Sequence, residues 1–133
     1  MKILVVEDSR FMRLAIQRAL EKSGHQVVVS GDGAEALRVL RANHPELVLL
    51  DMMLPGLPGL EVLRELKKGE DTKAIPVIVL TGLSDRNAEK LLSEGAAGYL
   101  AKSDKLLENG AAFLNKAIAE IISQESSGRP LPS

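Results

Sequence analysis

The sequence comprises 133 residues, of which 45% are hydrophobic and 26% are charged, and it has a formal net charge of -1. This composition is typical of one soluble globular domain, and the balanced charge lacks the basic excess that nucleic-acid binding requires. The absence of cysteine excludes disulfides and thiolate metal sites, and no apolar run or signal peptide indicates a membrane. We therefore expect a cytoplasmic protein that binds neither nucleic acid nor membrane, and any metal to have oxygen ligands.

Short apolar runs alternate with segments of helical periodicity along the chain. We predict strands at 3–6, 27–29, 47–50, 75–80 and 98–102, and helices at 10–23, 34–42, 60–68, 85–92 and 111–123. Ser9 is the predicted N-cap of the first helix and Gly24 its C′ residue; Ser84 or Asp85 can cap the fourth. This alternation with short connections predicts an α/β fold, in which a doubly wound parallel sheet is covered by helices on both faces.

The run at 47–50 is the most informative of the predicted strands. Its four consecutive apolar residues show no alternation, which indicates a central strand buried on both faces. The run ends abruptly at Asp51, and the loop at 52–59 contains two prolines and two glycines. In an open α/β sheet, ligands bind outside the carboxyl ends of the strands, so Asp51 lies where a site is expected. A loop residue or helix cap is the alternative.

The last helical region is predicted to be interrupted at Asn109-Gly110 and to continue from 111 to 123. We expect its apolar side chains to be buried, namely Phe113, Leu114, Ala117, Ile118, Ile121 and Ile122. The remaining residues, 124–133, are rich in Ser, Gly and Pro and are predicted to form a flexible tail or linker stub. The domain is thus predicted at 1–123.

Polar residues terminate four of the predicted strands. Because parallel strands point the same way, these side chains should share one edge of the sheet: Glu7, Asp8, Asp51, Thr81 and Lys102. Carboxylates in one crevice repel one another unless a cation bridges them. With no cysteine and only two histidines, Mg²⁺ is the expected cation.

These positions, in this order, resemble the receiver domain of two-component response regulators. The resemblance rests on Glu7-Asp8, the Asp51 of Asp-Met-Met-Leu-Pro-Gly, Thr81-Gly82, Tyr99 and Lys102, and it covers residues 1 to about 123. It implies a flavodoxin-like (α/β)5 fold with strand order 2-1-3-4-5. Many relatives carry proline after the lysine, where this chain has Ser103.

The resemblance also implies residue roles. Asp51 would be the phosphoacceptor, assisted by Lys102 and Thr81, with Gly82 leaving room for the phosphate and Tyr99 relaying the change together with Thr81. Glu7, Asp8, Asp51 and the backbone carbonyl of Met53 would bind Mg²⁺. The implied partners are a histidine kinase or histidine phosphotransfer protein, and a downstream protein target or a missing effector domain. A phosphorylation-dependent dimer is a further expectation.

Two other functions remain open at this stage. A degenerate receiver would serve as a protein-interaction module without phosphorylation. A phosphatase with a haloacid-dehalogenase-like site would need an acidic residue two positions after the nucleophile, where this chain has Met53. The favoured interpretation is a signalling switch, not an enzyme, which catalyses only its own phosphorylation and a slow dephosphorylation. The dephosphorylation is expected to be slow because Met53 and Leu83 are apolar where some relatives carry polar groups.

Overall fold

A computed structural model describes residues 1–82, 85–102 and 104–126 of the chain. Strands and helices alternate along it, with a short 3-10 helix before the last helix. The elements are β1 (Lys2–Val6), α1 (Arg10–Lys22), β2 (Gln26–Ser30), α2 (Gly33–Asn43), β3 (Leu47–Asp51), α3 (Gly59–Lys68), β4 (Val77–Thr81), α4 (Asp85–Ser93), β5 (Gly98–Ala101), the 3-10 helix η1 (Asp104–Leu107) and α5 (Glu108–Ser126). Leu83, Ser84 and Ser103 lie outside the described residues.

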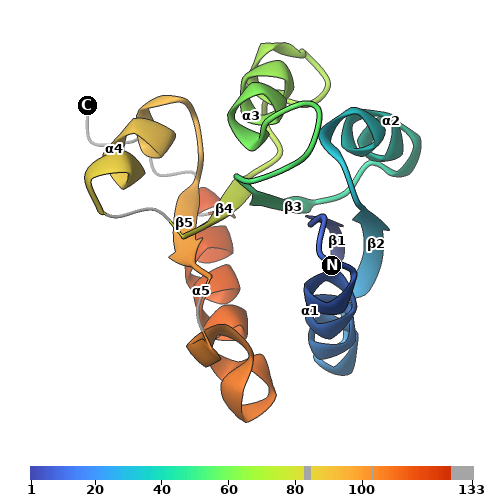
Figure 1. The fold of residues 1–133 in the computed structure, drawn as a ribbon, viewed down its shortest axis with the longest axis vertical. Coiled ribbons are helices and arrows are strands. Elements are labelled where there is room, and N and C mark those ends of the chain that lie inside the picture. Colours follow the sequence, from blue (N-terminus) through green and yellow to red (C-terminus); the bar gives the residue numbers. More distant parts are fainter. Residues whose placement is uncertain (83–84, 103, 127–133) are drawn as a thin grey trace.

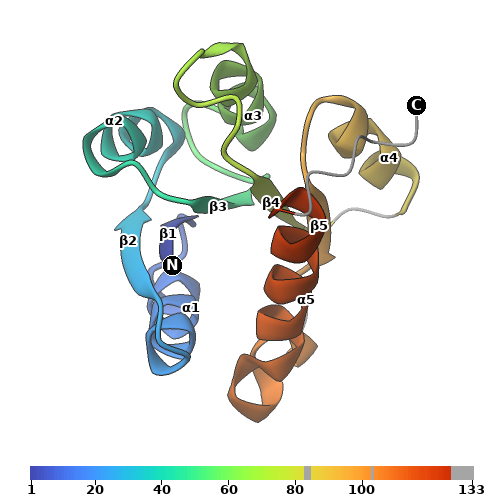
Figure 2. The same ribbon diagram turned by 180° about the vertical axis from the view of Figure 1, so that it is seen from behind.

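The strands form a five-stranded sheet in the order β2-β1-β3-β4-β5, and every neighbouring pair is parallel. Helices α1 and α5 cover one face of the sheet, and α2, α3 and α4 cover the other (Figures 1 and 2). The predicted doubly wound fold and its strand order are therefore confirmed. All strands point toward one edge, which collects the residues that follow them.

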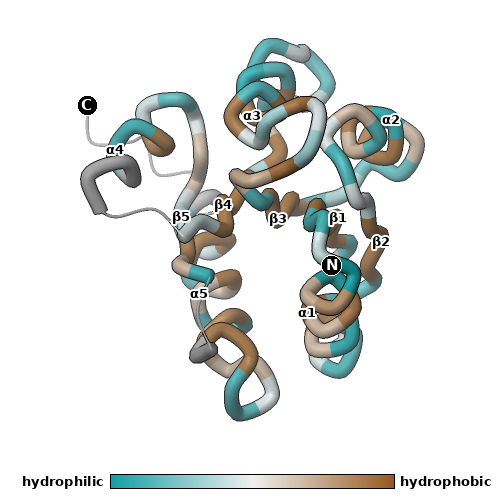
Figure 3. Tube along the Cα trace, viewed as in Figure 1, coloured by the Kyte–Doolittle hydropathy of each residue, from teal (hydrophilic) through white to brown (hydrophobic). Residues whose placement is uncertain are grey.

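Two apolar clusters, one on each face of the sheet, hold the layers together. Alternate residues of each central strand enter opposite clusters: Leu49 of β3 packs toward α1 and α5, whereas Leu50 packs toward α2 and α3. All five residues of β3 are buried, as the unbroken apolar run predicted. Figure 3 shows the hydrophobic colour concentrated in the central strands and on the sides of the helices that face them.

Local sequence signals explain most helix and strand ends. The Ser9 hydroxyl accepts a hydrogen bond from the Met12 N–H at 3.3 Å, and Gly24 adopts a positive φ of 94° after α1, so both predicted ends are confirmed. β4 begins at Val77, two residues later than predicted, because Pro76 has no N–H to contribute to the ladder. The Pro76 carbonyl still accepts a hydrogen bond from the Val48 N–H at 3.0 Å.

The last helix differs from its prediction in one respect. Asn109, Gly110 and Ala111 all have positive φ, so the predicted interruption at Asn109-Gly110 is present. Leu114 and Ile118 are buried, but Phe113 is 55% exposed, and its predicted burial is wrong. It lines a surface pocket together with Leu100 of β5. α5 ends at Ser126, so the first three residues of the predicted tail are helical, and 127–133 lie outside the described residues.

Two glycines allow the β3–α3 loop to pack closely against its neighbours. A Cβ added at Gly59 would collide with the carbonyl oxygen of Asp51 and with Met52 Cα, and one added at Gly33 would collide with the carbonyl oxygen of Leu57. Only a residue without a side chain permits such an approach of backbone to backbone. The first turn of α3 therefore lies directly against the end of β3.

Candidate functional site

Three side chains from distant parts of the chain meet beyond the ends of β1, β3 and β5. Lys102 Nζ lies 2.9 Å from Glu7 Oε1 and 3.1 Å from Asp51 Oδ2. The Glu7 and Asp51 side chains are 0% and 1% exposed, whereas Lys102 is 26% exposed. The lysine thus closes the pocket from the solvent side and bridges two buried carboxylates.

A third carboxylate, Asp8, lies at the exposed rim of the same pocket. One ligand oxygen from each of Glu7, Asp8 and Asp51 lies within 4.8 Å of the others. The structure therefore brings together the four charged residues that the sequence placed at the strand ends. A single ammonium group faces three carboxylates here, so the pocket retains an excess of negative charge.

Backbone N–H groups hold both buried carboxylates in place. The Met53 N–H donates to Asp51 Oδ1 at 3.0 Å, and the Ser9 N–H donates to Glu7 Oε2 at 3.0 Å. The other Glu7 oxygen, Oε1, is buried and accepts no hydrogen bond from the described residues, because its contact with Lys102 lacks hydrogen-bond geometry. The Lys102 ammonium, 2.9 Å away, compensates the charge of this oxygen as an ion pair, and its remaining hydrogen-bonding capacity is open to a metal ion.

The environment shifts two pKa values in this pocket. Burial raises the pKa of Glu7, because the effect of removing water outweighs the lowering by Lys102 and the Ser9 N–H. Burial opposes the charged form of Lys102, but Glu7 and Asp51 outweigh it and raise the Lys102 pKa. The lysine is therefore held as a cation between the carboxylates.

The donor set suits a hard divalent cation. Its candidate ligands are all oxygens, and one of them, Glu7 Oε1, is buried without a hydrogen bond. Mg²⁺ prefers carboxylate oxygens and retains several waters, for which the exposed position of Asp8 leaves access. The acidic pocket is thus able to bind a metal ion.

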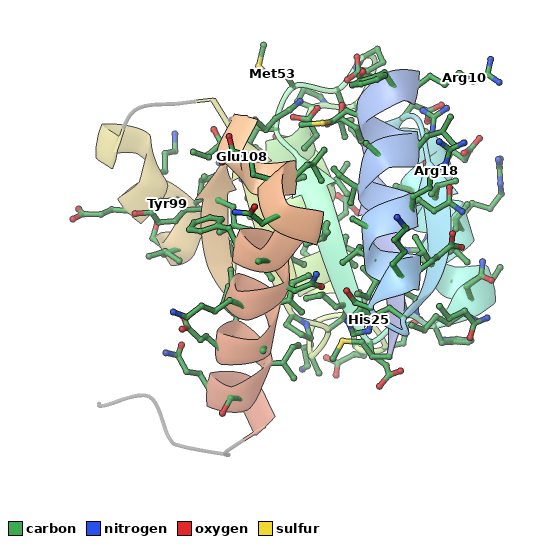
Figure 4. The ribbon with its side chains drawn as sticks, turned by 90° about the horizontal axis from the view of Figure 1, so that it is seen from below. Arg10, Arg18, His25, Met53, Tyr99 and Glu108 are labelled. Atoms are coloured by element: carbon green, nitrogen blue, oxygen red, sulfur yellow. The ribbon has the colours of Figure 1, made fainter. Side chains whose placement is uncertain are left out.

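The other predicted site residues lie at or just after the ends of β3 and β4. Thr81 is 3% exposed at the end of β4, and its carbonyl accepts a hydrogen bond from the Lys102 N–H at 2.9 Å. Gly82 follows it in open space, since an added Cβ would meet no atom within 4 Å. The Met53 side chain is 72% exposed and extends outward at this end of the molecule (Figure 4).

Tyr99 lies outside the pocket, on β5 at the edge of the sheet. Its side chain is 39% exposed, and Figure 4 shows it on the side of α4 and α5, away from Met53 and Arg10. In the register of β4 and β5, Tyr99 pairs with Val79 and Ala101 pairs with Thr81. Tyr99 and Thr81 are therefore diagonal neighbours on one face of the sheet.

Two of the contacts that the sequence did not predict come from the start of α1 and the residue before it. They are the Ser9 N–H that binds Glu7, and Arg13, whose Nη1 donates to the Glu7 carbonyl oxygen at 3.0 Å. The only sequence signal for Arg13 is its place one helical turn after the Ser9 cap, which returns it toward the end of β1.

Comparisons with known proteins agree with this geometry. The family model described as the response regulator receiver domain matches residues 3–109. Protein PilH of Pseudomonas aeruginosa is 38% identical over 76% of this chain and 84% of its own length. A crystal structure of a response regulator receiver domain protein from Clostridium thermocellum superposes with a TM-score of 0.81 at 35% identity, over 94% of this chain and 96% of that one.

The chain belongs to the response regulator receiver domain family. Members of this family are signalling switches of two-component systems and not typical enzymes. Response regulator MprA of Mycobacterium avium is also 38% identical, but the match covers 90% of this chain and only 54% of MprA. The chain thus spans about half the length of this relative. No helix in the described part of the chain is long and apolar enough to cross a membrane.

Proposed function

We propose that this domain is a phosphoacceptor switch in which Asp51 receives a phosphoryl group from a histidine kinase or a histidine phosphotransfer protein. A carboxylate oxygen of Asp51 attacks phosphorus and forms an O–P bond as the P–N bond of the phosphohistidine breaks. The electron pair stays on the imidazole nitrogen. The observation that carries the proposal is the convergence of Glu7, Asp51 and Lys102 at distances of 2.9 and 3.1 Å.

The residues around Asp51 have complementary roles in this reaction. Glu7, Asp8, Asp51 and the Met53 carbonyl hold Mg²⁺, which when bound supplies positive charge against the charge of the transferring group. Lys102 moves from the Asp51 carboxylate to a phosphoryl oxygen. The Thr81 hydroxyl binds another phosphoryl oxygen, and Gly82 leaves space beside the backbone.

The test is phosphorylation by a small donor that needs no partner protein. We expect acetyl phosphate and MgCl₂ to add one phosphoryl group to the wild type, detected by intact mass, and none to Asp51→Asn. Asp71→Asn is the matched control, because Asp71 is an exposed aspartate outside the pocket. Absence of an adduct on wild type and control would support a degenerate, non-phosphorylated module instead.

Output would reach a partner through Thr81 and Tyr99. When Thr81 is drawn toward the phosphoryl group, Tyr99 can leave its half-exposed position and turn inward, which changes the surface of β5 and its flanking helices. Tyr99 is the sole tyrosine and the sequence has no tryptophan, so its fluorescence reports this change directly. Acrylamide quenching should fall after phosphorylation; unchanged quenching would contradict the relay.

Loss of the phosphoryl group is proposed to be slow. Met53 and Leu83 offer no polar group to orient an attacking water, although Leu83 lies outside the described residues. The acyl phosphate should therefore persist in purified protein, and Met53→Asn should shorten its lifetime. Rapid decay of the wild-type adduct without a phosphatase would overturn this part of the proposal.

The downstream target is proposed to be a protein or an effector domain of the same regulator, with dimerisation on phosphorylation as a further consequence. Support comes from the relatives, since the match covers 54% of MprA. Sedimentation of phosphorylated and unphosphorylated protein tests the dimer.

A further inference from the structure

Arg13 makes an unusual contact beside the acidic pocket. It lies in the second turn of α1, and its Nη1 donates to the carbonyl oxygen of Glu7 at 3.0 Å. The Glu7 N–H donates to the carbonyl oxygen of Ser30 at 3.0 Å on the other side. The peptide groups on both sides of Glu7 are therefore fixed, one by α1 and the other by the end of β2.

The turn between β2 and α2 leaves space for this guanidinium. A Cβ added at Gly31 would lie 3.0 Å from Arg13 Nη1 and 3.8 Å from its Cζ. That contact is tighter than usual, so a side chain at position 31 would make the flexible end of Arg13 shift by a few tenths of an ångström. Gly31 thus permits the position from which Arg13 reaches Glu7.

The contact is a hydrogen bond to a neutral group and not an ion pair. In the described part of the chain, no carboxylate lies within ion-pair distance of Arg13, which donates to a neutral carbonyl beside three clustered carboxylates. A fixed positive charge at this place would by Coulomb repulsion weaken the binding of a divalent cation. Any benefit of Arg13 to metal binding must therefore come from the position in which it holds the Glu7 carbonyl.

We infer that Arg13 is a positioning residue for the metal site, which holds the Glu7-Asp8 turn through the Glu7 carbonyl and so raises the affinity for Mg²⁺. The inference rests on the proposed function, in which Glu7, Asp8 and Asp51 bind this ion. Residues that orient metal ligands without touching the metal commonly change its affinity by about tenfold or more when they are removed.

Charge and position predict opposite results for the same substitution. Titration calorimetry with MgCl₂ should show about tenfold weaker binding for Arg13→Met. Removal of a positive charge alone would instead strengthen binding. Arg10→Met is the control, because Arg10 is an exposed arginine of the same helix that extends away from the protein (Figure 4), and its loss should leave affinity equal or slightly tighter.

A second variant separates the guanidinium's position from its charge. Gly31→Ala keeps Arg13 but displaces its end, so it should also weaken Mg²⁺ binding, by less than Arg13→Met. It keeps the test decisive if Arg13→Met folds poorly. In phosphorylation by acetyl phosphate, both variants should need more Mg²⁺ for half-maximal rate and reach the wild-type rate at saturating Mg²⁺.

Three results would overturn the inference. Tighter Mg²⁺ binding by Arg13→Met, or unchanged binding with an unchanged rate, would show that Arg13 does not position the metal ligands. Unchanged affinity with a lower rate at saturating Mg²⁺ would place Arg13 on the phosphoryl group instead. Absence of Mg²⁺ binding by the wild type would remove the proposed metal site itself, and the inference with it; the first two results leave the proposed function intact.

Discussion

The charged pocket and the β5 edge of the sheet differ in how tightly their side chains are held. The pocket at the ends of β1 and β3 is buried, with Glu7 and Asp51 fixed by N–H donors and by Lys102. At the β5 edge, Tyr99, Leu92 and Phe113 are 39%, 44% and 55% exposed. The comparison shows a buried, hydrogen-bonded cluster of charged residues beside an edge whose side chains are more exposed, an arrangement that suits a switch.

Helix α4 lies at this edge, and most of its described side chains are exposed. Among its described side chains only Leu91 is buried, at 3% exposure. Beyond its last turn, Glu94 accepts two hydrogen bonds from Arg64 of α3, at 3.0 and 3.1 Å. Both contacts come from the carboxyl-terminal part of the helix and the residue just after it.

The largest expected effect follows from a substitution in the buried charged pocket. Lys102→Met leaves Glu7 and Asp51 buried without their cation, and should cost about 3 kcal/mol of unfolding free energy at neutral pH without Mg²⁺. Because a divalent ion can replace the ammonium, MgCl₂ should restore part of the loss. Urea denaturation with and without MgCl₂ measures both. Wild-type stability in the variant without Mg²⁺ would show that the bridge has no structural role.

The second prediction concerns the contact of α4 with the rest of the domain. Leu91→Ala removes the buried contact of α4 and should cost about 2 kcal/mol, near the low end for such substitutions because a surface helix can settle into the gap. Hydrogen exchange should accelerate in α4 and not in β1 or β3. Leu92→Ala, at a position 44% exposed, is the matched control and should change little. Equal acceleration throughout the sheet would contradict the comparison.

The third prediction concerns Asn109, which has a left-handed backbone conformation near the start of α5. Asn109 is exposed and has a φ of 54°, where alanine is disfavoured. Asn109→Ala should therefore cost about 1 kcal/mol, whereas Asn109→Gly should be close to neutral. Thermal unfolding of the pair measures the difference, and two equal melting temperatures would argue against the left-handed turn.

The smallest expected effect concerns the ion pair between Arg64 of α3 and Glu94, which follows α4. Arg64 lowers the pKa of Glu94 below its ordinary value of 4.5, so this pair stabilises the fold above that pH and the contribution is lost as pH falls through the lowered pKa. Glu94→Gln should reduce stability slightly at pH 7 and less at pH 4. Salt should weaken the effect, since both side chains are partly exposed. If Glu94→Gln reduced stability more at pH 4 than at pH 7, the result would contradict this prediction.

The fold and the charged cluster were readable from the sequence because they depend on patterns along the chain. The unbroken run before Asp51 required a central strand, and parallel strands required Glu7, Asp51 and Lys102 to share an edge. Strand order came from the resemblance, since periodicity does not determine which strands are neighbours.

Other features depend on contacts that no local pattern records. Helical periodicity placed Phe113 on the apolar side of α5, but the side chain is 55% exposed and lines a surface pocket with Leu100 of β5. The hydrogen bond from Arg13 to Glu7 likewise depends on Gly31, which lies 18 positions further along the chain and leaves the necessary space. Such contacts require the packed structure.

The absence of a side chain at Gly59 has a practical consequence for engineering. Because the first turn of α3 lies against the carbonyl of Asp51, even a methyl group there would force the start of α3 or the end of β3 to move. A swapped or lengthened loop from a related domain should be tolerated only if the graft keeps glycine at this boundary. Gly59 is therefore the position to preserve when new specificities are built onto this scaffold.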